Sequence, residues 1–111
     1  MTRHILVRTA GSKEQVLSRL KQSDDVWAEA YDVVMAWPGL RRLRAFWRHY
    51  YGASAEMQFE GKALSALSEE LHVVLAEGER LSPAARTFIR QFAQLCRVAI
   101  RQRARIEIVA D

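Results

Sequence analysis

The segment from Ser82 to Ile100 constrains the fold of this chain more than any other segment. Ser82 followed by Pro83 is a strong helix start, because a serine side chain caps free backbone N–H groups and proline fits the first helical position. The residues that follow place a continuous apolar face at helical spacing: Phe88, Ile89, Phe92, Leu95, Cys96, Ala99 and Ile100. A face of this length has to be buried, so the pattern predicts a long helix packed against a core.

Three segments upstream also have helical spacing. A helix capped within Ser23–Asp25 ends before Pro38, because proline disfavours helical geometry at the residue that precedes it. The next helix is predicted over about Leu40–Tyr51, with Gly52 as its C-terminal cap. The last of the three ends at Gly78 and carries a regular apolar stripe: Leu64, Leu67, Leu71, Val74 and Leu75.

A fifth helix is predicted near the N-terminus. Ser12-Lys13-Glu14-Gln15 has the form of a capping box, in which serine and glutamine side chains satisfy backbone donors at a helix start. The helix that it opens would turn three apolar residues inward: Val16, Leu17 and Leu20.

Both ends of the chain have the pattern of strands. His4–Arg8 is a short β-branched and apolar run, and Arg105–Val109 alternates between polar and apolar residues. The segment around Met57 and Phe59 fits either a short strand or an ordered loop. We therefore predict an α+β, predominantly helical fold over residues 1–111 as a single domain. It has about five helices, and short N- and C-terminal strands pair in a small sheet.

Composition narrows the class of protein. Half of the 111 residues are hydrophobic, which is too many for a disordered segment, and no apolar run approaches the roughly 20 residues of a membrane helix. The N-terminal apolar run is too short for a secretory signal, and the single cysteine, Cys96, excludes an internal disulfide. These features predict a small soluble cytoplasmic domain without a membrane partner.

No pattern in the sequence indicates a catalytic centre. His4, His49 and His72 lack metal-ligand spacing, and Cys96 lies on the apolar side of its helix, where a thiol behaves as a small hydrophobe. Nucleotide-binding and serine-hydrolase motifs are also missing from the sequence. We therefore expect no catalytic residue, no metal and no cofactor, and we interpret the chain as a protein that is not an enzyme.

Positive charge is concentrated in two segments. Within a net charge of +4, Leu40–Gly52 carries +4 and Arg86–Arg105 carries +6, so the remaining residues carry −6. This separation fits either a polyanion or a charged protein as the partner. Fourteen of the 17 basic residues are arginine, which suits bidentate contacts with carboxylates or phosphates, although a GC-rich genome produces the same bias.

The Leu40–Tyr51 helix holds the candidate binding residues. Arg41, Arg44 and Arg48 share one helix face, and no acid in that helix can pair with them. With their aromatic neighbours they form the predicted partner-binding set: Arg41, Arg42, Arg44, Arg48, Trp47 and Tyr51. The two helices around Trp37-Pro38-Gly39 look like a helix-turn-helix, but only arginines are available there to contact bases. A solvated face, or one paired with the chain's own acids, is the alternative interpretation.

One resemblance adds to this interpretation. Phe88-x3-Phe92-x2-Leu95-Cys96-x2-Ala99, followed by Arg105-Ile-Glu-Ile-Val-Ala-Asp111, resembles the tail of small bacterial toxin-immunity proteins and covers about a quarter of the chain. The resemblance implies a compact inhibitor that binds a cognate toxin, and it carries over no functional residue.

The leading hypothesis is therefore a non-enzymatic protein-binding module, an immunity or antitoxin-type inhibitor that occludes a bacterial toxin. The alternative is a small nucleic-acid-binding or regulatory protein that uses the arginine face. A third possibility is a homodimer formed by pairing of the terminal strands.

Overall fold

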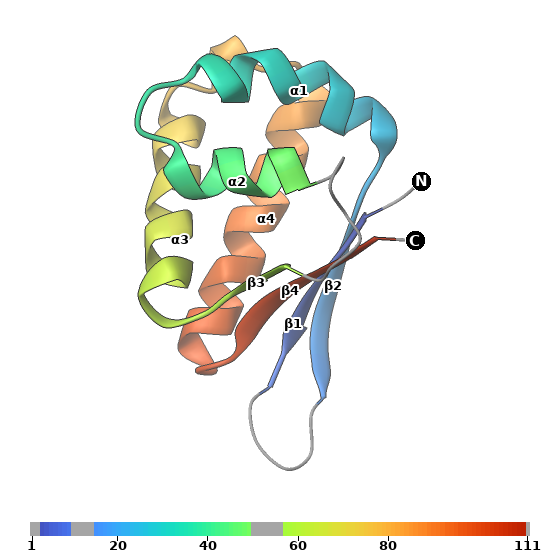
Figure 1. The fold of residues 1–111 in the computed structure, drawn as a ribbon, viewed down its shortest axis with the longest axis vertical. Helices are drawn as coiled ribbons and strands as arrows, with labels where there is room; N and C mark the ends of the chain where they lie inside the picture. The colour runs from blue at the N-terminus through green and yellow to red at the C-terminus, as the bar shows by residue number, and fades with distance from the viewer. Residues whose placement is uncertain (1–2, 10–14, 50–56, 111) are drawn as a thin grey trace.

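The chain folds as a mixed α+β structure with a four-stranded antiparallel sheet (Figure 1). The computed structural model describes residues 3–9, 15–49 and 57–110. Its elements are, in chain order, β1 (Arg3–Arg8), β2 (Val16–Gln22), α1 (Asp24–Ala36), α2 (Arg41–His49), β3 (Met57–Phe59), α3 (Gly61–Ala76), a 3₁₀ turn (Gly78–Arg80), α4 (Pro83–Arg101) and β4 (Arg105–Ala110). The predicted class is confirmed, with four α-helices in the described residues where about five were predicted.

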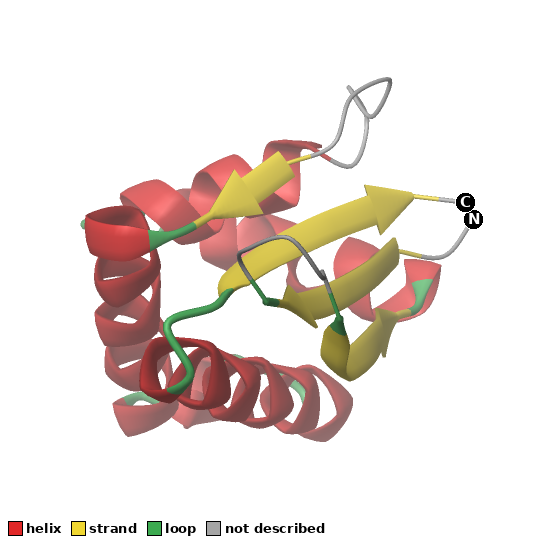
Figure 2. Ribbon diagram, turned by 90° about the horizontal axis from the view of Figure 1, so that it is seen from below, coloured by secondary structure: helices red, strands yellow, loops and turns green. Residues whose placement is uncertain are grey.

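The sheet has the strand order β2-β1-β4-β3, and Figure 2 shows the four strands side by side. The predicted pairing of the terminal strands is confirmed, because Ile5 lies opposite Ile108 and Val7 lies opposite Ile106. The segment at Met57 is a strand that pairs with β4. Both terminal strands are interior strands of the sheet. A homodimer that pairs through β1 therefore finds both of its edges already occupied.

The predicted helix at Val16–Leu20 is wrong, because this segment forms the edge strand β2. It pairs with β1 in antiparallel register, with Leu20 opposite Ile5. Val16 and Leu17 are 40% and 41% exposed instead of inward, and only Leu20 packs against the core. Hydrogen bonds to β1 have outweighed the local capping pattern, whose first three residues lie outside the described part of the chain.

The break between α1 and α2 lies where the sequence predicts it. The Ser23 hydroxyl accepts a hydrogen bond from the Val26 N–H at 3.3 Å, and Trp37 has extended backbone angles before Pro38. Gly39 then takes a φ of +84°, which suits glycine at the second central position of a turn that begins with proline. The chain therefore reverses within a few residues and brings α2 back against the core.

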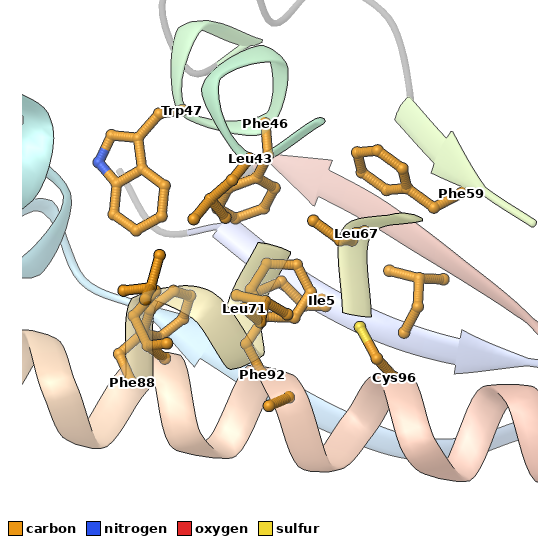
Figure 3. Close-up of a cluster of buried hydrophobic side chains, with 14 of the residues drawn as sticks. Ile5, Leu43, Phe46, Trp47, Phe59, Leu67, Leu71, Phe88, Phe92 and Cys96 are labelled. Atoms are coloured by element: carbon orange, nitrogen blue, oxygen red, sulfur yellow. The ribbon is translucent and has the colours of Figure 1, made fainter. Parts of the chain in front are cut away.

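The core lies between the helices and one face of the sheet. Figure 3 shows Leu43, Phe46 and Trp47 reaching it from α2, while Phe88, Phe92 and Cys96 reach it from α4 on the opposite side. Within the two predicted apolar stripes, these residues are buried: Leu67, Leu71, Phe88, Phe92 and Ala99. Leu95 is partly buried, and Ile100, which was expected on the apolar face of the helix, is 43% exposed at its edge. None of the described helices is long and apolar enough to span a bilayer.

Candidate functional site: the arginine-bearing helix

The N-terminal end of α2 is capped by a side chain from another helix. The two carboxylate oxygens of Glu70, on α3, accept hydrogen bonds from the backbone N–H groups of Arg42 (3.1 Å) and Leu43 (2.9 Å). These N–H groups have no partner within their own helix, and the negative charge lies at the positive end of the helix dipole. Glu70 therefore both satisfies the start of α2 and ties it to α3.

The C-terminal end of α2 is capped by side chains from two further elements, Arg3 from β1 and Trp27 from α1. The Arg3 guanidinium, from β1, donates a hydrogen bond to the Phe46 carbonyl at 2.8 Å and a second one to the Gln22 side chain at 2.9 Å. Its central carbon also lies 3.9 Å from the centre of the Phe46 ring. Arg3 is fully buried, and this burial lowers its pKa to about 9, which leaves it positively charged at neutral pH. A cation at this end of a helix is favoured by the dipole.

Trp47 belongs to this support and does not lie on the binding surface. Its indole N–H donates to the Trp27 carbonyl at 2.9 Å, while the Trp27 indole donates to the Trp47 carbonyl at 2.8 Å. Trp47 has no exposed surface, so its predicted place at the margin of the arginine patch is wrong. The large indole of Trp47 fills the space between α1 and α2, where its N–H has a buried acceptor. Tyr51, the other predicted aromatic, lies outside the described residues.

The four predicted arginines of α2 stay on its outer side. Arg41 and Arg48 are exposed, while Arg42 and Arg44 are half-buried. The Arg44 Nε donates to the Leu40 carbonyl at 3.4 Å, within its own helix turn. Among the described residues, none of the four forms an ion pair. We call these four residues the α2 arginine face.

A shallow hollow adjoins the N-terminal end of this face. It has a volume of about 400 Å³ and lies between the start of α2 and α3. Val73, which is 49% exposed, lines it together with Pro38 and Leu40. Glu69 and Glu70 contribute carboxylates to the same hollow. The surface around Arg41 is therefore mixed, with apolar groups and acids beside the arginine.

These acids bear on the helix-turn-helix interpretation. That motif inserts the N-terminal part of its second helix into the DNA groove. In this protein the corresponding helix end is occupied by the Glu70 carboxylate, with Glu69 beside the same hollow. Two negative charges at that end repel phosphates, so the arrangement disfavours nucleic acid as the ligand of α2.

A larger hollow of about 860 Å³ lies between the start of α3 and the end of α4. Its floor includes Leu64 and Ala99, but its charged lining combines acids and bases without one dominant sign: Glu60, Glu69, Lys62, Arg103 and Arg105. This mixture does not select the charge of a ligand.

Cys96 is fully buried, and burial raises the pKa of its thiol to about 12, so the reactive thiolate is absent at neutral pH. No group of three metal-ligating side chains comes together among the described residues.

On the sheet, the buried Glu107 carboxylate pairs with the guanidinium Nε atoms of Arg8 (3.2 Å) and Arg105 (3.6 Å). Sequence reasoning missed this cluster, although its arginines and glutamate have the strand parity of one face.

The supports of α2 were also missed. Glu70, Arg3 and Trp27 lie 27, 43 and 20 positions from the α2 residues that they contact, so no local pattern links them. One signal was available, since Arg3 has the same strand parity as the core residues Ile5 and Val7.

Comparison of the chain with protein-family models, with curated proteins and with solved structures gave no match.

Proposed function

We propose that this chain is a non-enzymatic protein-binding module whose α2 arginine face binds an acidic surface of a protein partner. The observation that carries this proposal is the support of α2 by three other elements. A helix of nine residues is marginal on its own, yet side chains from β1, α1 and α3 bind its backbone at both ends. This support fixes a surface whose arginines form no ion pair among the described residues.

The surroundings of this face favour a protein over a nucleic acid. Protein interfaces are enriched in arginine and combine a polar rim with partly apolar contacts. Arg41 lies next to a hollow lined by Val73 and Pro38, which offers such contacts. The carboxylates of Glu69 and Glu70 in the same hollow would repel a phosphate backbone, but they can receive basic side chains from a protein.

The mechanism that we propose is inhibition by occlusion. Arginine guanidinium groups bind carboxylates through two parallel hydrogen bonds, so a rigid helix that presents several of them is preorganised for an acidic surface. The resemblance of the C-terminal segment to small toxin-immunity proteins supports an inhibitor of this type. The partner would then be a bacterial toxin, and the module would act by covering its active site.

The test uses the product of the reading frame that lies immediately upstream of the gene. We expect this product to inhibit growth when expressed alone and to be neutralised by the chain. A triple variant, Arg41→Ser, Arg44→Ser and Arg48→Ser, should keep its circular dichroism spectrum and bind the product at least tenfold more weakly, or about 1.4 kcal/mol.

A matched control removes the same charge elsewhere. The variant with Arg90→Ser, Arg97→Ser and Arg101→Ser, all on the exposed side of α4, should bind the product with unchanged affinity. Equal loss in both triple variants would show that net charge drives binding. Normal binding by the α2 variant would show that this face is scaffold, and the proposed function would be wrong.

A further inference from the structure

Helix α4 carries a second set of arginines, which the proposed function does not use. With 3.6 residues per turn, four of them fall within about 60° of arc and span about 22 Å along the helix. Arg90, Arg97 and Arg101 are exposed, and Arg86 is half-buried. We call these four residues the α4 arginine strip.

The strip has no negative charge on its own helix. Pro83–Arg101 contains neither Asp nor Glu, and none of the four arginines forms an ion pair with another residue in the described ranges. Exposed Thr87, Gln91 and Gln94 lie along one side of the strip. Arginine together with neutral amide and hydroxyl groups is the combination that contacts phosphate and sugar in nucleic-acid complexes.

The strip and the α2 arginine face belong to helices on opposite sides of the core (Figure 3). Figure 3 shows α2 and α4 on opposite sides of the core, with Trp47 and Phe46 reaching inward from one and Phe88 and Phe92 from the other. The exposed arginines, Arg41 and Arg48 on α2 and Arg90, Arg97 and Arg101 on α4, lie outside the buried faces of their helices. The two basic surfaces are therefore separate, and a ligand of one does not cover the other.

We propose that the α4 arginine strip binds the phosphate backbone of a nucleic acid, without reading its sequence. The chemistry of the strip favours this ligand over two others. A protein interface is built around apolar or aromatic anchors, whereas Ile100 is the one large apolar side chain that α4 exposes. A helix that binds a membrane surface inserts its apolar face into the lipid, but the apolar face of α4 is buried in the core.

The residue after the helix gives independent support. Arg103 has a φ of +52°, in the left-handed region, at a position where helices usually end with glycine. A side chain costs free energy in this conformation. The chain nevertheless has an exposed arginine there, two residues after Arg101.

The experiment measures by fluorescence anisotropy how the protein binds a labelled 20-base-pair DNA duplex of mixed sequence, at salt concentrations between 50 and 200 mM. A single-stranded DNA and an RNA of the same length are measured in parallel. We expect micromolar affinity for at least one of the three probes. On duplex DNA, three to four neutralised phosphates give a log–log salt slope between about −2.7 and −3.6. The variant with Arg90→Gln, Arg97→Gln and Arg101→Gln should bind at least tenfold more weakly and lose most of this slope.

The matched control is Arg41→Gln, Arg44→Gln and Arg48→Gln, which removes the same three charges from a net charge of +4. This control should bind within threefold of the unchanged chain. Equal loss in both variants, or loss in the α2 variant alone, would overturn the proposal. Circular dichroism and thermal unfolding of both variants confirm that the fold is kept.

Two other ligands of the strip would also overturn the proposal. One result is binding to phosphatidylserine vesicles with none to the nucleic-acid probes. The other is salt-sensitive self-association in sedimentation, with no probe binding, which would show that the exposed acids of α1 (Asp25, Glu29 and Asp32) are the partner of the strip. Neither result affects the proposed function, whose test measures binding of a protein partner to α2. If the α2 face binds no protein partner, the proposal for the α4 arginine strip is likewise unaffected.

Discussion

Replacing Glu70 tests whether α2 depends on its cap from α3. The Glu70→Ala variant removes both acceptors of the Arg42 and Leu43 N–H groups. Loss of an N-terminal cap costs about 0.5–2 kcal/mol, and loss of the charge at the helix dipole adds about 0.3–1 kcal/mol. We therefore expect a loss of about 2 kcal/mol in the free energy of unfolding, out of the 5–15 kcal/mol typical of a small domain. Glu70→Gln keeps one acceptor without the charge and should lose about half as much.

The assay is urea unfolding followed by tryptophan fluorescence, since Trp27, Trp37 and Trp47 are all buried. The midpoint should fall while the dependence on urea concentration stays the same. Glu69→Ala is the matched control, because it removes the same charge from the neighbouring exposed position without a cap. If Glu70→Ala and Glu69→Ala have equal stability within about 0.5 kcal/mol, the cap does not hold α2 in place.

Three further changes test other parts of the structure. Phe92→Ala should cost about 3–5 kcal/mol, because Phe92 is fully buried between Phe46 and Phe88, and wild-type thermal stability would refute the assigned packing. Burial raises the pKa of the Cys96 thiol from 9.0 to about 12 in the folded state. Between these values the unfolded chain loses the thiol proton while the folded chain keeps it, so the wild type should lose stability as the pH rises above 9. The Cys96→Ala variant should lack this loss of stability. Arg3 contributes in the opposite direction, because its pKa is lowered, but it does so equally in both proteins. Identical stability–pH profiles of the two proteins would contradict the burial of the Cys96 thiol. Arg103→Gly should raise stability by about 1 kcal/mol, because glycine tolerates the positive φ, and should weaken nucleic-acid binding; a less stable variant would argue against strain at this residue.

The helices could be predicted because their signals are local. A serine cap, a proline and a regular apolar stripe act within one helix, and these signals placed α1 and α4 close to their observed bounds. β2 could not be predicted in the same way. Val16–Gln22 has no local feature that decides between helix and strand, and its hydrogen bonds with β1 determine the outcome. The capping-box pattern just before it therefore gave the wrong prediction.

The candidate site was predictable only on its outer side. Helical spacing alone placed Arg41 and Arg48 on an exposed face. The inner side depends on which elements meet α2, and that is a property of the whole fold. Trp47 shows the consequence, because an indole near arginines in the sequence is compatible with an exposed anchor until Trp27 is known to lie against it. Its burial is therefore a result of the α1–α2 packing and not of its own neighbours in the chain.

Two basic segments that look alike in the sequence have different surroundings in the fold. Both are rich in arginine and free of acids, and composition alone assigns them one partner. In the fold, α2 begins beside the carboxylates of Glu69 and Glu70 and an apolar hollow, whereas the α4 arginine strip is accompanied by Thr87, Gln91 and Gln94. Both basic surfaces attract anions, and the groups beside the arginines determine which anion is favoured. We therefore propose a protein as the ligand of the α2 arginine face, which adjoins carboxylates from α3, and a phosphate backbone as the ligand of the α4 arginine strip, which adjoins hydroxyl and amide groups of its own helix.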